Sequence, residues 1–243
     1  MTSQAQHIIL RKLRNDILQY QSASPHQIHE GIKLSFLSNN CSTDNSGYLP
    51  TGIHEFLNST NEDAAATSGF IAALLRKQMT NGGICAWISL SGSVFPAALA
   101  AFGVDADRVI FVNIQKEKDA LWVMEEALKC EQLSAVVGEI KNIDLTASRR
   151  LQLAVERSRI NGFVLRYATH KLNPIASVSK WRITSVASNV ENGMPGVGFP
   201  MWNVELLKIR NGKTGSWKVE FAEGRFKAIP QDAADHEQML KAV

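Results

Sequence analysis

Short apolar runs alternate with helical patterns through the middle of the chain, and this alternation limits the fold more than any other feature. The apolar runs have the length and composition of buried strands, and they lie at 53–57, 84–89, 109–113, 135–137 and 163–167. Helical periodicity is found in the segments 64–79, 94–101, 117–130 and 145–160. Because strands that alternate with helices form parallel sheets covered on both faces, the sequence predicts an α/β fold with a mainly parallel sheet flanked by helices.

The last third of the chain has strand patterns without helices between them. These patterns lie at 181–187, 202–209 and 217–221. Asn211 and Gly212 form a strong turn signal between the last two. We therefore expect antiparallel C-terminal strands that extend the parallel sheet.

The N-terminal region has a different character. Residues 3–20 show an amphipathic helical pattern whose apolar stripe includes Ile9, Leu13 and Ile17. Ser and Asn are frequent after it, as in a linker, and a helix held on a linker docks on its own domain or on a partner protein. The predicted organisation is an N-terminal helix at 1–20, a linker at 21–50, a core at 51–229 and a C-terminal tail at 230–243.

Composition excludes several classes of protein. With 45% hydrophobic and 20% charged residues, the chain is that of an ordinary globular protein. It contains no apolar run near the roughly 20 residues that span a bilayer, and its start lacks the apolar core of a signal peptide, so we expect a cytoplasmic protein without membrane contact. The three cysteines are isolated, and His26 and His29 have no further ligands nearby, so no metal site or disulfide is expected.

The stretch from Gly52 to Lys77 has the strand, loop and helix layout of a phosphate-binding P-loop. Such a loop needs glycines that let backbone N–H groups surround the phosphates, a lysine for the terminal phosphates and a hydroxyl for magnesium. If the loop begins at Asn58, then Asp63 stands at the second glycine, Ala64 at the lysine and Ala65 at the hydroxyl. A carboxylate repels phosphate and a methyl group cannot bind metal. We interpret the loop as degenerate and expect no ATP or other cofactor.

Basic residues are concentrated between 141 and 182. This segment holds nine Lys and Arg against two acidic residues, a net charge of +7. Four of the basic residues belong to the predicted helix at 145–160: Arg149, Arg150, Arg157 and Arg159. Such a block can contact nucleic acid or an acidic partner surface, and a solvated helix face is the alternative.

Several local runs occur in the order of a RecA core. The run 85–96 matches, without a gap, the family segment that carries the catalytic glutamate after its strand, and 103–105 follows at the family's spacing. Asn211 and Lys213 lie in a closing hairpin much like the family's last strands. The chain therefore resembles the RecA core from about residue 49 to residue 226.

The departures from that family concern its chemistry. Ser91 stands at the position of the catalytic glutamate and cannot act as a general base for an attacking water. Glu139, at the end of the Walker B strand, is still able to reach a metal. The segments 142–148 and 168–179 replace the two DNA-binding loops in shortened form. The resemblance thus implies a RecA-like fold without ATP hydrolysis or strand exchange, and we expect no enzyme.

The degenerate loop, the run 144–156 and an ending with Trp202, Trp217 and the run 224–226 are together similar to the ImuA family. This resemblance implies a non-catalytic accessory or scaffold protein of SOS-induced translesion DNA synthesis. Its partners would be RecA or an ImuB-type protein of the cassette, with direct DNA contact and self-association left open.

The same resemblance gives a role to three basic residues near the final hairpin, Lys208, Arg210 and Lys213. In RecA relatives this hairpin lies at the subunit interface, so the three residues are candidates for partner contact. Exposed charges at strand ends are the alternative. Two further functions stay open: a weak ATP-dependent DNA-binding protein that uses Glu139, and a SulA-like cell-division inhibitor.

Overall fold

Strand β3 (Ile53–Asn58) lies inside the sheet and pairs in parallel with two strands that come much later in the chain, β7 (Asn161–Tyr167) and β8 (Ser179–Val186). From β7 the sheet continues in parallel through β6 (Leu133–Glu139), β4 (Ile84–Ser89) and β5 (Val109–Asn113). Every residue of β3, β4 and β6 is buried, because both faces of the sheet are covered there. The computed structural model describes residues 12, 32–37, 47–90, 92, 94–167, 173–188 and 198–230.

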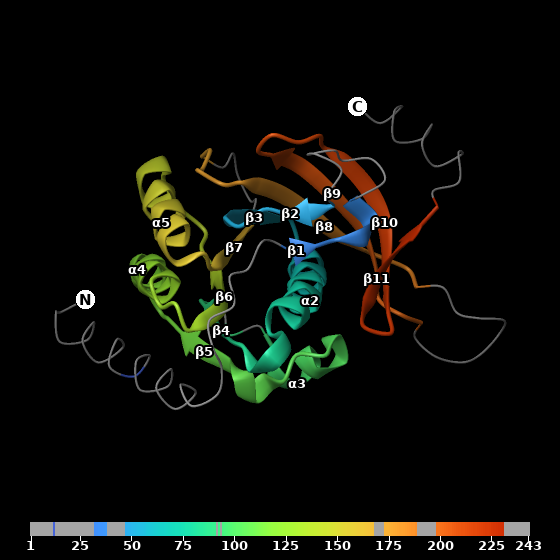
Figure 1. The fold of residues 1–243 in the computed structure, drawn as a ribbon, viewed down its shortest axis with the longest axis horizontal. Coiled ribbons are helices and arrows are strands. Elements are labelled where there is room, and N and C mark those ends of the chain that lie inside the picture. The colour runs from blue at the N-terminus through green and yellow to red at the C-terminus, as the bar shows by residue number, and fades with distance from the viewer. Residues whose placement is uncertain are drawn as a thin grey trace.

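Beyond β8 the sheet becomes antiparallel. Strands β9 (Met201–Ile209), β10 (Gly215–Ala222) and β11 (Arg225–Ile229) follow one another as neighbours. In the described part the strand order is therefore β11-β10-β9-β8-β3-β7-β6-β4-β5 (Figure 1). Asn211, in the turn between β9 and β10, adopts the left-handed conformation that Asn tolerates better than most residues. The predicted fold class, a mainly parallel sheet with antiparallel C-terminal strands, is confirmed.

Helices cover the sheet from both sides. Helix α2 (Asn61–Gln78) and the short α3 (Pro96–Leu99) lie on one face, and α4 (Glu117–Leu128) and α5 (Leu145–Ser158) lie on the other (Figure 1). Each face has its own cluster of buried apolar side chains. The sequence predicted a longer helix at 94–101, whereas the chain forms only the four residues of α3 and then a 3-10 turn, η3 (Ala100–Phe102).

Aromatic rings join the antiparallel strands to α2. Phe70 of α2 lies 5.6 Å from Trp202 and 5.1 Å from Phe226, measured between ring centroids. Trp181, Trp202 and Trp217 are all buried, so these tryptophans fill the core and do not form a stacking platform for bases. The aromatic cluster explains how four strands without their own covering helices are held against the parallel half.

Part of the segment that the sequence placed in the linker belongs to the packed body. Strands β1 (Ile32–Lys33) and β2 (Tyr48–Leu49) pair in antiparallel fashion, with a 3-10 turn, η1 (Ser35–Leu37), after β1. Leu34, Phe36 and Leu49 are fully buried, and the ring of Phe36 contacts those of Phe70, Trp217 and Phe226. The segment packs in the core because its apolar side chains are buried there, although its many Ser and Asn residues had predicted a linker. The predicted helix at 3–20, except Lys12, and the tail after residue 230 lie outside the described residues.

Candidate site at the carboxyl edge of the sheet

The carboxyl ends of the parallel strands meet at one edge of the sheet, here called the carboxyl edge. Asn58 ends β3, Ser89 ends β4, Glu139 ends β6 and Tyr167 ends β7. Open α/β sheets bind their ligands outside this edge, near the point where the strand order reverses. A nucleotide site in this fold would therefore be built from these residues and from the turn after β3.

The turn after β3 is only two residues long, and side chains of the same chain accept hydrogen bonds from the backbone N–H groups at the start of α2. Thr60 is the N-cap, and its hydroxyl accepts a hydrogen bond from the backbone N–H of Asp63 at 3.1 Å. The Asp63 carboxylate in return accepts the N–H groups of Ser59 and Thr60, each at 3.1 Å. The free N–H groups at a helix start are what binds an anion, and here a carboxylate of the same chain accepts two of the N–H groups at this turn.

This geometry corrects the predicted start of the helix. The sequence placed a loop at 58–63 and the helix from Ala64, whereas α2 begins at Asn61. Thr60 and Asp63 form a reciprocal capping box, with Asp in place of the usual Glu or Gln, and this signal was missed. Ala64 is therefore a buried residue of the first helical turn, and Ala65 is exposed on its surface.

Asn58 is directed into the interface between β3 and α2. Its side-chain oxygen accepts a hydrogen bond from the Thr67 hydroxyl at 2.6 Å, and both residues are fully buried. The contact joins the end of the strand to the second turn of the helix. Asn58 thus serves the packing of this junction, and its oxygen does not face the solvent side of the edge.

Glu139 is also buried and tied to a neighbouring strand. Its carboxylate accepts the backbone N–H of Leu90, directly after β4, at 3.1 Å. Burial raises the pKa of Tyr167, and the negative charge of Glu139 adds to this rise. The Ser89 hydroxyl accepts the N–H of Gly92 at 2.8 Å in the same turn. Ser91, expected where RecA proteins carry the catalytic glutamate, lies outside the described residues.

A buried ion pair crosses the sheet close behind this edge, and the sequence analysis missed it. Arg166 on β7 lies 2.5 Å from the Glu55 carboxylate on β3, measured from Nη1 to Oε1, and the two side chains are 1% and 2% exposed. Arg166 also donates to the carbonyl of Asn173, and Lys180 lies 3.7 Å from the second Glu55 oxygen. Opposite charges inside two apolar strand patterns were the available signal, because such charges are seldom buried unless they pair.

The opposite end of the parallel strands, here called the amino edge, brings together two predicted basic groups. Helix α5 ends at Ser158, directly before β7 starts, so Arg157 and Arg159 lie at this edge. Ile209 of β9 pairs with Ser179 at the start of β8, which places Arg210 and its hairpin at the same edge. The predicted basic residues on α5 and in the hairpin are exposed: Arg149, Arg150, Arg157, Arg159, Lys208, Arg210 and Lys213.

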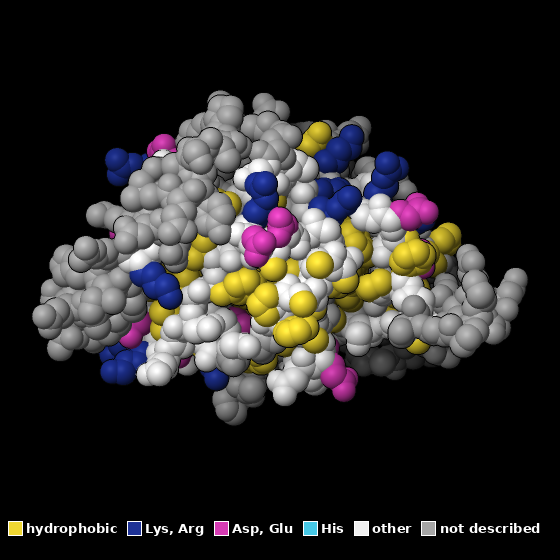
Figure 2. Space-filling view, turned by 90° about the horizontal axis from the view of Figure 1, so that it is seen from below, with side chains coloured by type: hydrophobic (Ala, Val, Ile, Leu, Met, Phe, Trp, Pro, Cys, Tyr) yellow, Lys and Arg dark blue, Asp and Glu magenta, His cyan; other side chains and the backbone are white. Residues whose placement is uncertain are grey.

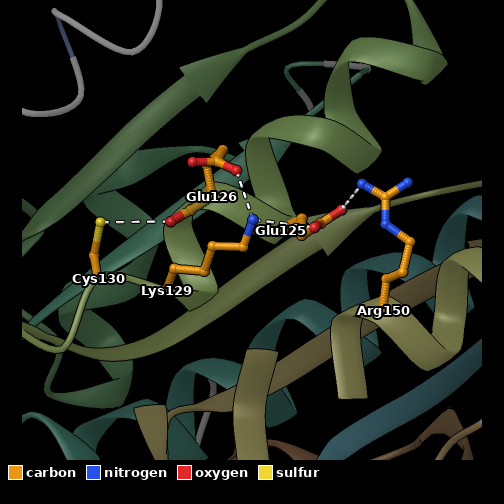
Figure 3. A network of polar contacts seen from close by, with 5 residues as sticks. All are labelled: Glu125, Glu126, Lys129, Cys130 and Arg150. Carbon is orange, nitrogen blue, oxygen red and sulfur yellow. Dashed lines mark hydrogen bonds and ion pairs between the residues drawn. The ribbon is translucent and has the colours of Figure 1, made fainter. Parts of the chain in front are cut away.

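The four α5 arginines differ in their contacts. Arg150 lies 2.5 Å from the Glu125 carboxylate of α4, and Lys129 lies 3.1 Å from Glu125 and 2.8 Å from Glu126 (Figure 3). Arg149 and Arg157 instead alternate with two exposed leucines at a spacing of four residues, in the order Leu145, Arg149, Leu153, Arg157; the leucines are 42% and 63% exposed. One face of α5 is thus both basic and apolar.

Metal ligation finds no support in the described residues. Across those ranges no three His, Cys, Asp or Glu side chains are grouped so that they could hold a metal ion. His26, His29 and Cys41 lie outside those ranges. None of the helices that the structure describes has the length and apolar character that a membrane crossing requires.

The strand order, the parallel half with helices on both faces and the antiparallel extension define a RecA-like α/β protein. A KaiC-like protein of Pyrococcus horikoshii has this fold: it aligns with a TM-score of 0.53 over 85% of this chain and all of its own, at 13% sequence identity. SulA of Pseudomonas aeruginosa aligns with 49% of this chain at a TM-score of 0.42 and 19% identity. No protein-family model matches the chain.

Sequence similarity defines the family more closely than the fold does. The chain is 33% identical over 209 residues to Protein ImuA of Caulobacter vibrioides, with the same match in two strains. The matched region covers 79% of this chain and 85% of that relative. The chain belongs to the ImuA family, as the matched runs predicted.

Proposed function

We propose that this protein is a non-catalytic RecA-like scaffold of DNA-damage-induced mutagenesis, which acts in translesion synthesis by binding RecA or an ImuB-type protein. Membership of the ImuA family supports a role in DNA-damage-induced mutagenesis. The RecA-like fold suits a protein that binds other proteins through the surfaces of that fold. The loop after β3 is proposed to be a degenerate P-loop that binds no nucleotide.

The observation that carries the proposal is the Asp63 carboxylate at the start of α2. It accepts the N–H groups of Ser59 and Thr60, which lie where a phosphate would have to bind. A phosphate would meet a like charge there, and a two-residue turn is too short to surround it. Glu139, on which a weak ATP-dependent activity would depend, is buried and accepts the N–H of Leu90.

The partner surface is proposed to lie on α5 and the adjoining amino edge. Exposed leucines beside Arg149 and Arg157 offer apolar contact together with positive charge. Protein interfaces combine apolar and basic side chains in this way, whereas binding to a phosphate backbone needs chiefly charge. We therefore favour an acidic protein surface as the partner over DNA.

The nucleotide part of the proposal is tested by thermal-shift and hydrolysis assays with ATP and magnesium. We expect no rise in melting temperature at millimolar ATP and no turnover, because a ligand that binds only the native state would stabilise it. The Ala64→Lys, Ala65→Thr variant should behave in the same way, since the short turn and the Asp63 carboxylate remain. A clear shift or turnover in the unaltered protein would overturn the proposal.

The partner part is tested by pull-down with purified RecA and with the ImuB-type protein of the same cassette. We expect capture by one of them, and loss of capture in the Arg149→Glu, Arg157→Glu variant. Lys118→Glu, a charge reversal at an exposed position of α4, is the matched control and should bind normally. Binding to DNA alone, with an affinity that falls steeply with salt, would favour the alternative of a DNA-binding module.

A further inference from the structure

An exposed apolar surface lies on the segment around α3, far from the basic face of α5. Phe95 is 69% exposed, and the small apolar residues after it are exposed as well: Pro96, Ala97, Ala98, Ala100 and Ala101. We call these six residues the α3 patch. Figure 2 looks at the molecule from the side where α3 lies in Figure 1, and hydrophobic side chains gather in the middle of that face.

The α3 patch is firmly anchored to the core. Leu99, in the middle of the run, is 3% exposed. Phe102 stacks on Trp202 at 6.0 Å between ring centroids and also contacts Phe221, and Gly103 ends the turn in the left-handed conformation. The patch is therefore exposed even though its segment is packed against the core. A contiguous exposed apolar run of this kind marks an interaction surface.

The chain enters the described body at β1, which contacts α2, and α2 in turn contacts η3 at the patch. The Lys77 ammonium at the end of α2 donates to the carbonyl of Lys33 at 2.7 Å. Its neighbour Arg76 packs against Gly103, where an added Cβ would lie 2.5 Å from the guanidinium nitrogen Nε. The side chains of Lys77 and Arg76 and the few residues between Gly103 and the patch together place Lys33 on the order of 20 Å from the patch.

The preceding segment has the length to cover the patch. Residues 21–31 can span up to about 36 Å when extended, and a helix at 3–20 would be about 27 Å long. Lys12, the residue of this segment that the structure describes, is helical and exposed. This agrees with its expected place on the polar side of the amphipathic pattern.

The segment and the patch also match in chemistry. Ile9, Leu13 and Ile17 recur every four residues and share one face of a helix, while alanine methyl groups on the patch allow a helix to approach closely. Arg11, Lys12 and Arg14 make the segment basic. The exposed aspartates Asp105 and Asp107 lie at η4 (Ala106–Arg108), which contacts α3.

We propose that residues 3–20 dock the stripe of Ile9, Leu13 and Ile17 on the α3 patch of the same chain. The purified protein would then carry this surface covered, and the basic face of α5 would remain open for a partner. This inference is independent of the proposed function, since it concerns a different surface and needs neither nucleotide nor partner.

Disulfide trapping in the full-length protein tests the contact. Leu13→Cys is combined with Ala98→Cys in a chain whose Cys41 and Cys130 are replaced by Ser. The control pair combines Leu13→Cys with Ser216→Cys, which is exposed on β10 next to the inward-facing Trp217 and so points to the opposite side of the sheet. We expect the first pair to form a monomeric disulfide at least about tenfold faster than the control. Equal rates would overturn the proposal, and a disulfide found only in dimers would assign the patch to a second copy.

Thiol labelling provides a second, independent readout. In the same background the remaining native thiol, Cys85, is fully buried, so labelling reports on the introduced thiol of Ala98→Cys, which should react slowly with a maleimide. Leu13→Asp should raise that rate by about tenfold because it removes the apolar contact. Asn15→Asp adds the same charge on the polar side and should leave the rate unchanged. A fast rate without Leu13→Asp, or one that falls only when a partner protein is added, would contradict docking within the chain.

Discussion

The two edges of the parallel sheet use polar residues in opposite ways. At the carboxyl edge, Asn58, Asp63 and Glu139 accept hydrogen bonds from this chain's own hydroxyl and backbone N–H groups. At the amino edge, Arg157, Arg159 and Arg210 are exposed to solvent. Polar groups at the carboxyl edge, where this fold class binds ligands, therefore stabilise the fold, whereas the exposed positive charge lies at the amino edge.

The largest effect is expected in the interior, from the pair of Glu55 and Arg166. Glu55→Leu leaves the Arg166 charge buried without its partner, which should lower the free energy of unfolding by about 3–5 kcal/mol. Urea unfolding measures this loss. The double variant with Arg166→Met should recover most of it, because removing both charges also removes the desolvation cost.

A half-exposed pair is the control for that experiment. Arg182 lies 3.1 Å from Glu205, with the two side chains 43% and 23% exposed. Glu205→Leu should lower the stability by less than about 1 kcal/mol, because solvent screens the pair. Equal losses at Glu55 and Glu205 would contradict the contrast between the buried pair and the surface pair.

His54 is a buried titratable group at the amino edge, and its ring contacts Ser179 at 2.7 Å and Asn161 at 3.4 Å. Burial lowers the pKa of His54 to about 4. Between this pKa and the ordinary value the unfolded state binds more protons, so stability is fully present above the ordinary value and falls with pH below it. Lowering the pH from near 7 to near 5 should cost about 2 kcal/mol at this site.

Urea unfolding at the two pH values measures the change, and His54→Gln is the control. That variant should lose most of the pH dependence in this window, whatever its absolute stability. An unchanged slope in His54→Gln would show that other groups cause the dependence.

A smaller effect is expected at the capping box of α2. Thr60→Ala removes the N-cap hydroxyl and should lower the free energy of unfolding by about 1 kcal/mol. Thr60→Ser keeps the hydroxyl and should be neutral, as thermal unfolding can show. Asp63→Ala removes the carboxylate and should still gain no affinity for ATP, because the two-residue turn is too short to surround a phosphate. A gain of affinity in a thermal-shift titration would mean that the carboxylate covers a phosphate site.

The smallest effects on stability are expected on α5. Arg150→Ala breaks the contact with Glu125 and should cost less than about 1 kcal/mol, since the arginine is largely exposed. Arg149→Ala and Arg157→Ala should change the stability by no more than about 0.5 kcal/mol. Thermal unfolding checks all three variants, and a large loss at Arg149 would mean that this face supports the fold.

The candidate site was only partly predictable from the sequence. Glu139 was expected at the end of its strand and is found there. The start of α2 was misplaced by three residues because the polar run 58–63 was interpreted as a loop, although Thr60 and Asp63 carry a capping signal. The partner of Arg166 could not be predicted, because the residues that pair lie 111 positions apart and meet only when β3 and β7 become neighbours.

The sequence by itself was sufficient for the fold class and the family. Alternating strand and helix periodicity is a local property of the chain, and it determined the parallel sheet and its antiparallel extension; the matched runs determined the ImuA family. Only the tertiary structure decided that residues 32–37 pack in the core, that Glu55 pairs with Arg166 and that two distant basic groups share the amino edge. The physical reason is that these features depend on contacts between segments remote in sequence, whose pairing no local pattern contains.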